Sequence, residues 1–281
     1  MNFFHIIILA VVQGIAELLP VSSSAHVIVA EKLMGLDPTA PSMTLILVLL
    51  HTGTMFAVIV YFWKSWRESY FSSTQQFISN GKGVLVATVA TGVVGLALLQ
   101  LIQHVWANNA PGFEIEQLFG NSRLMAASLA AAGVLIILSS PLAASGKNEV
   151  SIRSALWIGA VQGLCLPFRG FSRSGATIST GLVLGVARRR AEEFSFALAV
   201  VLTPVVMAKE GYRLCKVETA STVSDVSTFW HLAGPGLLGM LLSFLTGLLA
   251  LRWLSRWLEQ GRWHLFGAYC LFASVVVLWI G

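Results

Sequence analysis

Three charged side chains lie deep inside apolar stretches of the sequence: Glu17, Arg169 and Arg173. Charges at membrane depth are costly and usually face a polar cavity or a partner, so these positions indicate a functional site. Gln13 precedes Glu17 by four residues, which places both side chains on one face of a helix. A carboxylate and an amide supply oxygen ligands for a hard divalent cation, which also takes water and phosphate oxygens. We therefore predict a cation, Mg²⁺ or Ca²⁺, at Gln13 and Glu17.

A polar turn follows Glu17, where Pro20 ends the helix and Ser22, Ser23, Ser24 and His26 follow. Hydroxyls and freed backbone N–H groups at a broken helix end form a concavity that binds anions. A histidine beside them can act as general acid or base and can activate a serine. The alternative is that the serines only cap a helix and that His26 is a satisfied polar residue.

The second polar stretch, residues 162–180, reads QGLCLPFRGFSRSGATIST. It combines glycines with the run Ser172, Arg173 and Ser174, and Thr177 lies one helical turn further on. Arginine binds phosphate oxygens through two parallel hydrogen bonds and stays charged at any relevant pH. The stretch predicts a phosphate group held inside a membrane, and hence a phosphorylated lipid ligand. A purely structural pair between Glu17 and Arg173 is the alternative.

The composition indicates a membrane protein. Hydrophobic residues make up 56% of the chain and charged residues only 11%, against about 25% in soluble domains. No basic run interleaved with aromatic residues lies outside the apolar segments, so the net charge of +5 does not predict a nucleic-acid partner. The expected partners are membrane lipids and a lipid substrate, and the oligomeric state, monomer or homodimer, stays open.

The order of apolar segments predicts an all-α polytopic protein built from two inverted repeats. A membrane-spanning helix needs about 20 apolar residues, and six segments qualify: 43–62, 83–106, 121–140, 194–212, 232–252 and 264–280. Two further apolar regions, 2–34 and 153–187, are broken by the polar stretches and are predicted to be re-entrant helix pairs. Both begin alike, with AVVQGI at 10–15 and GAVQGL at 159–164. We expect one integral membrane domain, 1–281, with halves near 1–150 and 151–281.

Three spans per half would turn the second half upside down, and the positive charges agree with this topology. One side receives eleven basic residues: Lys64, Arg67, Lys82, Lys147, Arg153, Arg188, Arg189, Arg190, Arg252, Arg256 and Arg262. The other receives five: Lys32, Arg123, Lys209, Arg213 and Lys216. Cytoplasmic loops are richer in basic residues. Both termini, the loops 35–42, 107–120 and 213–231, and the opening of the site are therefore expected outside, and the Arg188–Arg190 run is expected to be a cytoplasmic anchor.

The two motifs resemble those of a known family. QGIAELLPVSSSAH is similar to the acidic and serine–histidine region of the undecaprenyl-diphosphatase family, the integral-membrane phosphatases of bacitracin resistance. GFSRSGATIS resembles that family's PGxSRSGAT signature, and EEFSFALAV at 192–200 resembles the stretch that follows it. The resemblance covers nearly the whole chain.

That resemblance implies removal of the terminal phosphate from undecaprenyl (C55 isoprenyl) diphosphate, which recycles the carrier lipid for peptidoglycan synthesis in the bacterial plasma membrane. It also implies an inverted-repeat fold and dependence on a divalent cation. By position, the family's acidic pair falls on Gln13 and Glu17, its serine on Ser23, its histidine on His26 and its arginine on Arg173. The substrate-binding residues are then expected to be Ser22, Ser24, Arg169, Ser172, Ser174 and Thr177.

Two positions depart from the family pattern. Gln13 is an allowed variant that removes one anionic ligand, and Arg169 stands where the family usually has proline, which adds a second cationic group near the phosphate. Whether a serine or a cation-bound water attacks, and which prenyl chain length is preferred, stays open.

Three other functions compete with the hydrolase. A polyprenyl-phosphate transporter or flippase has a similar architecture, but its anionic cargo needs no carboxylate beside a serine. A lipid phosphatase with a histidine nucleophile needs a second histidine oriented by an aspartate, whereas the only two aspartates, Asp37 and Asp225, fall in expected loops. A channel is not indicated because no polar stripe that could line a pore is present.

Overall fold

The computed structural model describes residues 3–36, 41–105, 121–144, 146, 148–220 and 226–280. These residues are almost entirely helical, and in them the only β-type pairing is an isolated bridge between Asn148 and Val186. The helices are α1 (Phe3–Leu18), α2 (Ser23–Leu33), α3 (Pro41–Tyr70), α4 (Thr74–Val105), α6 (Ser122–Ser139), the short 3-10 helix η1 (Pro141–Ala144), α7 (Ile152–Cys165), α8 (Arg173–Val183), α9 (Arg188–Ala220), α10 (Val226–Glu259) and α11 (Trp263–Ile280). The prediction of an all-α polytopic membrane protein is confirmed.

Both broken apolar regions form pairs of short helices, as predicted. In the first, α1 ends at Leu18, before Pro20, and α2 begins at Ser23. In the second, α7 ends at Cys165 and α8 begins at Arg173. Each helix has 11 to 16 residues, too few to cross a bilayer core of about 30 Å at 1.5 Å per residue. None of these four helices can therefore cross the core alone, and the return of each pair to the side it entered from stays a prediction.

Among the described residues, five helices are long and apolar enough to cross a membrane, namely Leu45–Tyr70, Thr74–Val105, Ser122–Ser139, Gly234–Glu259 and Trp263–Ile280. Each covers one of the predicted spans to within one or two residues at the ends of that span. The sixth, 194–212, lies within the 33-residue helix α9, which is not one of these five and contains Pro204. Its role as a span stays a prediction. The expected loop 107–120 lies outside the described residues, as does 37–40 of the expected loop 35–42. The expected loop 213–231 is mostly helical instead, because α9 continues to Ala220 and α10 begins at Val226.

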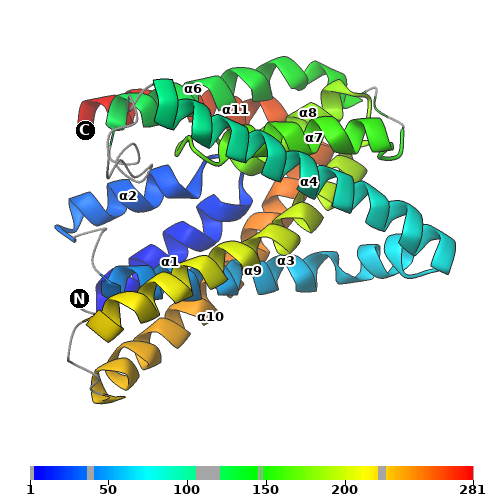
Figure 1. Ribbon diagram of the computed structural model, residues 1–281. Coiled ribbons are helices and arrows are strands. Elements are labelled where there is room, and N and C mark those ends of the chain that lie inside the picture. Colours follow the sequence, from blue (N-terminus) through cyan, green and yellow to red (C-terminus); the bar gives the residue numbers. More distant parts are fainter. Residues whose placement is uncertain are drawn as a thin grey trace.

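The order of a helix pair followed by three long helices occurs twice along the chain. Helix α1 packs against α10, and its counterpart α7 packs against α4, while α3 contacts α9 and α6 contacts α11. In Figure 1 the start of α1 and the end of α11 lie at the left end of the molecule, and the α1–α2 pair opens toward that end. The exchange of partners between the halves is what an inverted repeat would produce; the inversion itself stays a prediction.

The repeated VQG sequence has a packing role in both halves. A Cβ on Gly14 would lie 1.9 Å from Oγ1 of Thr246, so any larger residue would push α1 away from α10. A Cβ on Gly163 would lie 2.8 Å from the carbonyl oxygen of Thr91 in α4. Contacts below about 3.0 Å are not seen for real side chains, and small residues let membrane helices approach closely. Both halves therefore need glycine at this position of the repeated sequence.

A polar cluster ties the start of α9 to its neighbours. Glu192 and Glu193 are 3% and 2% exposed. Glu193 accepts hydrogen bonds from Ser65 of α3 and, at 2.8 Å, from Arg189, while Ser255 of α10 donates to Glu192 at 2.5 Å. The arginine run expected only to anchor the protein at the membrane surface therefore also neutralises a buried carboxylate, which such burial requires.

Candidate functional site

The two helix turns that the sequence singled out lie next to each other. Ser174 at the start of α8 donates a hydrogen bond of 3.2 Å to the carbonyl oxygen of Leu19 in the first turn. The thiol of Cys270 in α11 donates to the neighbouring carbonyl of Pro20 at 3.2 Å. These bonds satisfy carbonyl groups that α1 leaves free where it ends. The two polar stretches, far apart in sequence, are thereby fixed against each other.

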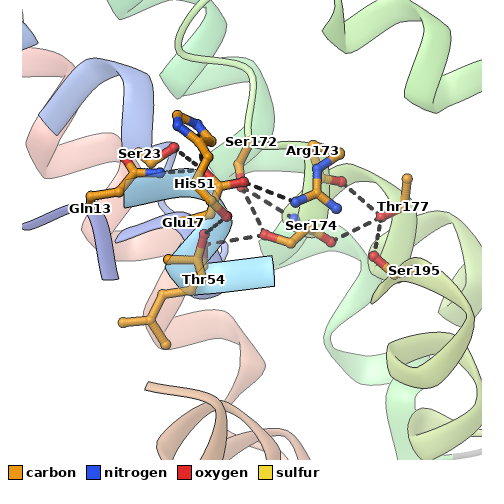
Figure 2. A network of polar contacts seen from close by, with 12 residues as sticks. Gln13, Glu17, Ser23, His51, Thr54, Ser172, Arg173, Ser174, Thr177 and Ser195 are labelled. Atoms are coloured by element: carbon orange, nitrogen blue, oxygen red, sulfur yellow. Dashed lines mark hydrogen bonds and ion pairs between the residues drawn. The ribbon is translucent and has the colours of Figure 1, made fainter. Parts of the chain in front are cut away.

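Glu17 is the centre of the polar network in Figure 2, with Gln13 and Ser23 on one side of its carboxylate and Arg173 on the other. Its Oε2 accepts a hydrogen bond of 2.5 Å from the Ser23 hydroxyl and one of 3.3 Å from Nε2 of Gln13. Its Oε1 accepts one of 3.2 Å from Nη2 of Arg173. The carboxylate is therefore placed to take a proton from a hydroxyl while an arginine balances its charge.

Arg173 keeps hydrogen-bonding capacity for a ligand. Its Nη2 is used by Glu17, but its buried Nη1 has no hydrogen-bond partner among the described residues. An unsatisfied guanidinium N–H is costly when buried, because the lost hydration is not replaced. A phosphate oxygen would remove that cost, and guanidinium groups suit phosphate geometry. This orphaned donor is the clearest mark of an anion site in the molecule.

Two helix N-termini face the same cavity. Ser22 precedes α2 with φ of 67°, a left-handed conformation that is rare for serine, and its side chain makes no capping hydrogen bond. Ser172 caps α8 by accepting from the backbone N–H of Gly175 at 3.2 Å. Free N–H groups and the positive end of a helix dipole attract anions. Backbone strain of the kind at Ser22 tends to occur at functional sites.

The cavity between these turns has a volume of about 200 Å³. It holds most of the predicted site residues, and its lining is Ala16, Glu17, Leu19, Ser22, Ser23, Ser24, Gln162, Cys165, Leu166, Phe168, Arg169, Phe171, Ser172, Arg173 and Ser174. Gln13 is not in this lining but contacts it through Glu17. The cavity is polar where the serines and arginines lie and apolar where leucine and phenylalanine side chains lie, which suits a lipid with an anionic headgroup.

Two predicted site residues direct their polar atoms elsewhere. Nδ1 of His26 lies 2.8 Å from the carbonyl oxygen of Ser22, and its Nε2 lies 2.7 Å from the hydroxyl of Tyr269 in α11. Thr177 is fully buried and donates 2.8 Å to the carbonyl oxygen of Arg173, while its hydroxyl lies 2.6 Å from that of Ser195. Neither residue lines the cavity. The roles assigned to them stay predictions, and in this structure both bonding networks stabilise the scaffold.

Arg169 lines the cavity together with Arg173. Its guanidinium also interacts electrostatically with Glu31 of α2, whose side chain is 1% exposed and whose Oε1 has no hydrogen-bond partner in the described part of the chain. Burying a carboxylate is costly unless a cation lies near it. Arg169 thus lies in the field of a buried acid that partly compensates its charge.

His51 is a site residue that the sequence did not reveal. It lies in the middle of α3, in the apolar run LVLLHTGTMFAV, and its Nε2 is 3.7 Å from Oε2 of Glu17. Figure 2 shows it beside Glu17 and Ser23. A lone histidine within a spanning helix is itself a signal, because ionisable groups in such helices usually face a polar site. No pattern in the sequence indicates which polar stretch His51 would join.

The residues around Glu17 suit a divalent cation that is bound partly by the protein and partly by a phosphate ligand. Oxygen atoms are available from the Glu17 carboxylate and the serine hydroxyls, which are ligand types for Mg²⁺ and Ca²⁺. The Gln13 amide faces Glu17 with its Nε2 and would have to turn over to add its oxygen. No cluster of three or more His, Cys, Asp or Glu side chains suited to a metal occurs in the described ranges. Such a donor set leaves several coordination positions to water and phosphate oxygens.

The helical fold, the membrane-length helices and a cavity lined by a carboxylate, serines and an arginine define the class: an integral membrane protein with a polar site for an anionic ligand. The chain belongs to the bacitracin resistance protein BacA family, whose sequence model matches residues 6–276. It is 63% identical over 278 residues to undecaprenyl-diphosphatase 2 of Acinetobacter baylyi, covering 99% of this chain and 98% of the relative. It is 31% identical to the undecaprenyl-diphosphatase of Korarchaeum cryptofilum (99% of each chain) and 32% identical to that of Desulfosudis oleivorans (98% and 97%).

Proposed function

We propose that this protein hydrolyses undecaprenyl diphosphate to undecaprenyl phosphate and inorganic phosphate, recycling the carrier lipid used in cell-wall synthesis. One observation carries the proposal: Glu17 holds the Ser23 hydroxyl at 2.5 Å and Arg173 at 3.2 Å, so a base, a hydroxyl and a phosphate-binding group share one cavity. Family membership and the names of the relatives point to the same reaction. Hydrolysis of the anhydride explains the carboxylate and serine, which transport alone would not need.

The chain's own groups have distinct parts in the reaction. Nη1 of Arg173 and the N–H groups at the starts of α2 and α8 bind the terminal phosphate and stabilise the charge that develops on it. Glu17 takes the proton from the attacking oxygen, either the hydroxyl of Ser23 or a water molecule at the same position, and undecaprenyl phosphate leaves. If Ser23 attacks, a water molecule then hydrolyses the phosphoserine and releases inorganic phosphate. Arg169, next to Arg173 in the cavity lining, is suited to the second phosphate, which remains on the lipid.

A divalent cation fits beside these groups, held by Glu17 and Gln13. When bound, it supplies positive charge that neutralises the diphosphate and polarises the bond to be broken. Because all the protein groups proposed here come from a single chain, we propose that the monomer is the catalytic unit.

The orientation in the bilayer follows from the charge distribution. The basic residues near the start of α9 and the end of α10 belong to the proposed cytoplasmic side. The α1–α2 pair then opens to the outer side, together with both termini, and the headgroup enters from the outer leaflet while the isoprenyl tail stays in lipid. The bacterial plasma membrane is the corresponding location.

The test is phosphate release by the purified full-length protein in detergent. We expect release from a long-chain prenyl diphosphate that stops at the monophosphate, requires a divalent cation and is absent after chelation. Detergent removes any transmembrane gradient, so a protein that only moves the lipid would release none. Absence of release with every divalent cation tried would overturn the proposed function.

A further inference from the structure

The geometry points to His51 as a direct ligand of the site's divalent cation: we propose that its Nε2 and Oε2 of Glu17 bind the same ion. This inference rests on the proposed function, because it concerns the cation of that same site. It adds a nitrogen ligand to a site for which the sequence predicted only oxygen ligands, and it changes which metals the site should prefer.

The first step is the state of the imidazole ring. Nδ1 of His51 lies 2.7 Å from the carbonyl oxygen of Leu47, one helical turn earlier. A carbonyl oxygen only accepts hydrogen bonds, so Nδ1 carries the hydrogen. In the neutral ring the lone pair is then on Nε2. Metal-binding histidines typically donate their other N–H to a backbone carbonyl or carboxylate in this way, which fixes the tautomer and the ring orientation.

The second step is where that lone pair is directed. Nε2 of His51 lies 3.7 Å from Oε2 of Glu17, beyond hydrogen-bond distance, and no hydrogen bond to Nε2 is found within the described ranges. Two ligand atoms that are each about 2.1 Å from a shared cation lie roughly 3–4 Å apart. The observed separation therefore leaves the right spacing for one ion between a carboxylate oxygen and an imidazole nitrogen.

The third step is a comparison with the other histidine near the site. His26 is fixed in the same way, with Nδ1 at 2.8 Å from the carbonyl oxygen four residues earlier. Its Nε2, however, is already bonded to the hydroxyl of Tyr269 at 2.7 Å, and the two rings stack with centroids 5.6 Å apart. Only the His51 nitrogen is aimed at the Glu17 carboxylate. The two residues therefore form a matched pair for an experiment.

The helix that carries His51 is held firmly in place. A Cβ at Gly53 would lie 2.2 Å from both the carbonyl oxygen of Met240 and Oγ of Ser243, so α3 lies unusually close to α10 at this point. Ser243 also donates to the carbonyl oxygen of Leu50 at 2.9 Å. A ligand on such a fixed backbone needs little reorganisation to bind an ion. Imidazole suits Zn²⁺ and Fe²⁺, whereas oxygen ligands suit Ca²⁺, so a nitrogen ligand shifts the preference of the site away from Ca²⁺ and toward transition metals.

The experiment measures cation binding without turnover. Mn²⁺ binding to the detergent-purified full-length protein, with and without inorganic phosphate, is followed by electron paramagnetic resonance, and pulsed spectra detect coupling of Mn²⁺ to an imidazole ¹⁴N. We expect coupling in the wild type and in His26→Ala, but not in His51→Ala. We also expect His51→Ala to weaken Mn²⁺ binding about tenfold or more and Ca²⁺ binding much less.

His51→Gln serves where the alanine variant does not fold, because glutamine keeps most of the side-chain volume. It is expected to bind Mn²⁺ without ¹⁴N coupling. Coupling that persists in either folded His51 variant, unchanged Mn²⁺ affinity in a folded His51→Ala, or a wild type that binds no Mn²⁺ would overturn the inference. Phosphate release in the same preparations tests the proposed function separately. If the wild type releases phosphate but the Mn²⁺ site is unchanged in a folded His51 variant, only the role of His51 is overturned. If the His51 variant loses the coupling but the wild type releases no phosphate, only the proposed function is overturned.

Discussion

Oε1 of Glu17 and Nη2 of Arg173 lie 3.2 Å apart although 156 positions separate the two residues in the chain. One lies near the end of α1 and the other begins α8, so this contact joins the two re-entrant pairs. Both side chains are only partly buried, at 17% and 20% exposure, which leaves them accessible to a ligand in the cavity. A pair that served only to hold the halves together would not need an unsatisfied Nη1.

We predict that Arg173→Lys lowers kcat roughly 100-fold, the size of effect expected when one preorganised donor to a developing charge is lost. Lysine keeps the positive charge but loses the planar fork, in which two NH₂ groups can bind Glu17 and a phosphate at the same time. The measurement is phosphate release, with the melting temperature as a control for folding. Turnover close to that of the wild type in a folded variant would remove Arg173 from the phosphate site.

We predict opposite results at the two positions of the acidic pair. Glu17→Gln should abolish cation-stimulated phosphate release, because the base and the anionic ligand are lost together. Gln13→Glu should be tolerated and should lower the cation concentration needed for half-maximal activity, since it adds a negative ligand beside Glu17. Both are measured by titrating the cation at saturating substrate. Equal damage from the two changes would mean that the pair is structural.

Ser23 can be tested as the nucleophile because its hydroxyl lies 2.5 Å from the carboxylate of Glu17. If the serine attacks, rapid quenching with substrate labelled in its terminal phosphate should trap the label on the protein, and Ser23→Ala should trap none. In that case Ser23→Ala should also lower kcat more than 1,000-fold, because the covalent step is lost. Appreciable turnover by Ser23→Ala would assign the attack to water.

Thr177 distinguishes a scaffold role from a substrate-binding role. Thr177→Val removes the bonds from its hydroxyl to Ser195 and to the carbonyl of Arg173, both in a buried setting. We expect a loss of about 1–3 kcal/mol in stability from the unsatisfied partners, with KM unchanged. The double variant with Ser195→Ala, which removes both hydroxyls, should recover part of that stability. A large rise in KM without loss of stability would instead support the predicted contact between Thr177 and the substrate.

The side on which the site opens can be tested by labelling. Ser24→Cys, introduced into an active variant without Cys165, Cys215 and Cys270, places a thiol in the cavity lining at a partly exposed position. We expect an impermeant thiol reagent added outside intact cells to label it, and a prenyl diphosphate to protect it. Replacing Cys270 by serine preserves a donor to Pro20. Labelling only from the cytoplasmic side would reverse the proposed orientation.

The sequence alone determined the class of protein, the two broken helix pairs and most of the site. Composition and segment length decide membrane insertion, because each apolar helix partitions into lipid largely on its own, and proline and serine runs break helices locally. Glu17, Ser23 and Arg173 could also be predicted as site residues from the motifs, since charged and hydroxyl groups are conspicuous in an apolar chain.

Only the tertiary structure decided which polar groups meet. His51 lies 34 residues beyond Glu17, on a different helix, and no local pattern predicts that its Nε2 would come within 3.7 Å of that carboxylate. The side chains of His26 and Thr177 likewise point toward hydrogen-bond partners on other helices, Tyr269 of α11 and Ser195 of α9. Helix packing determines such contacts through many small steric fits, among them the close approaches at Gly14 and Gly53, and these depend on side chains from both helices at once.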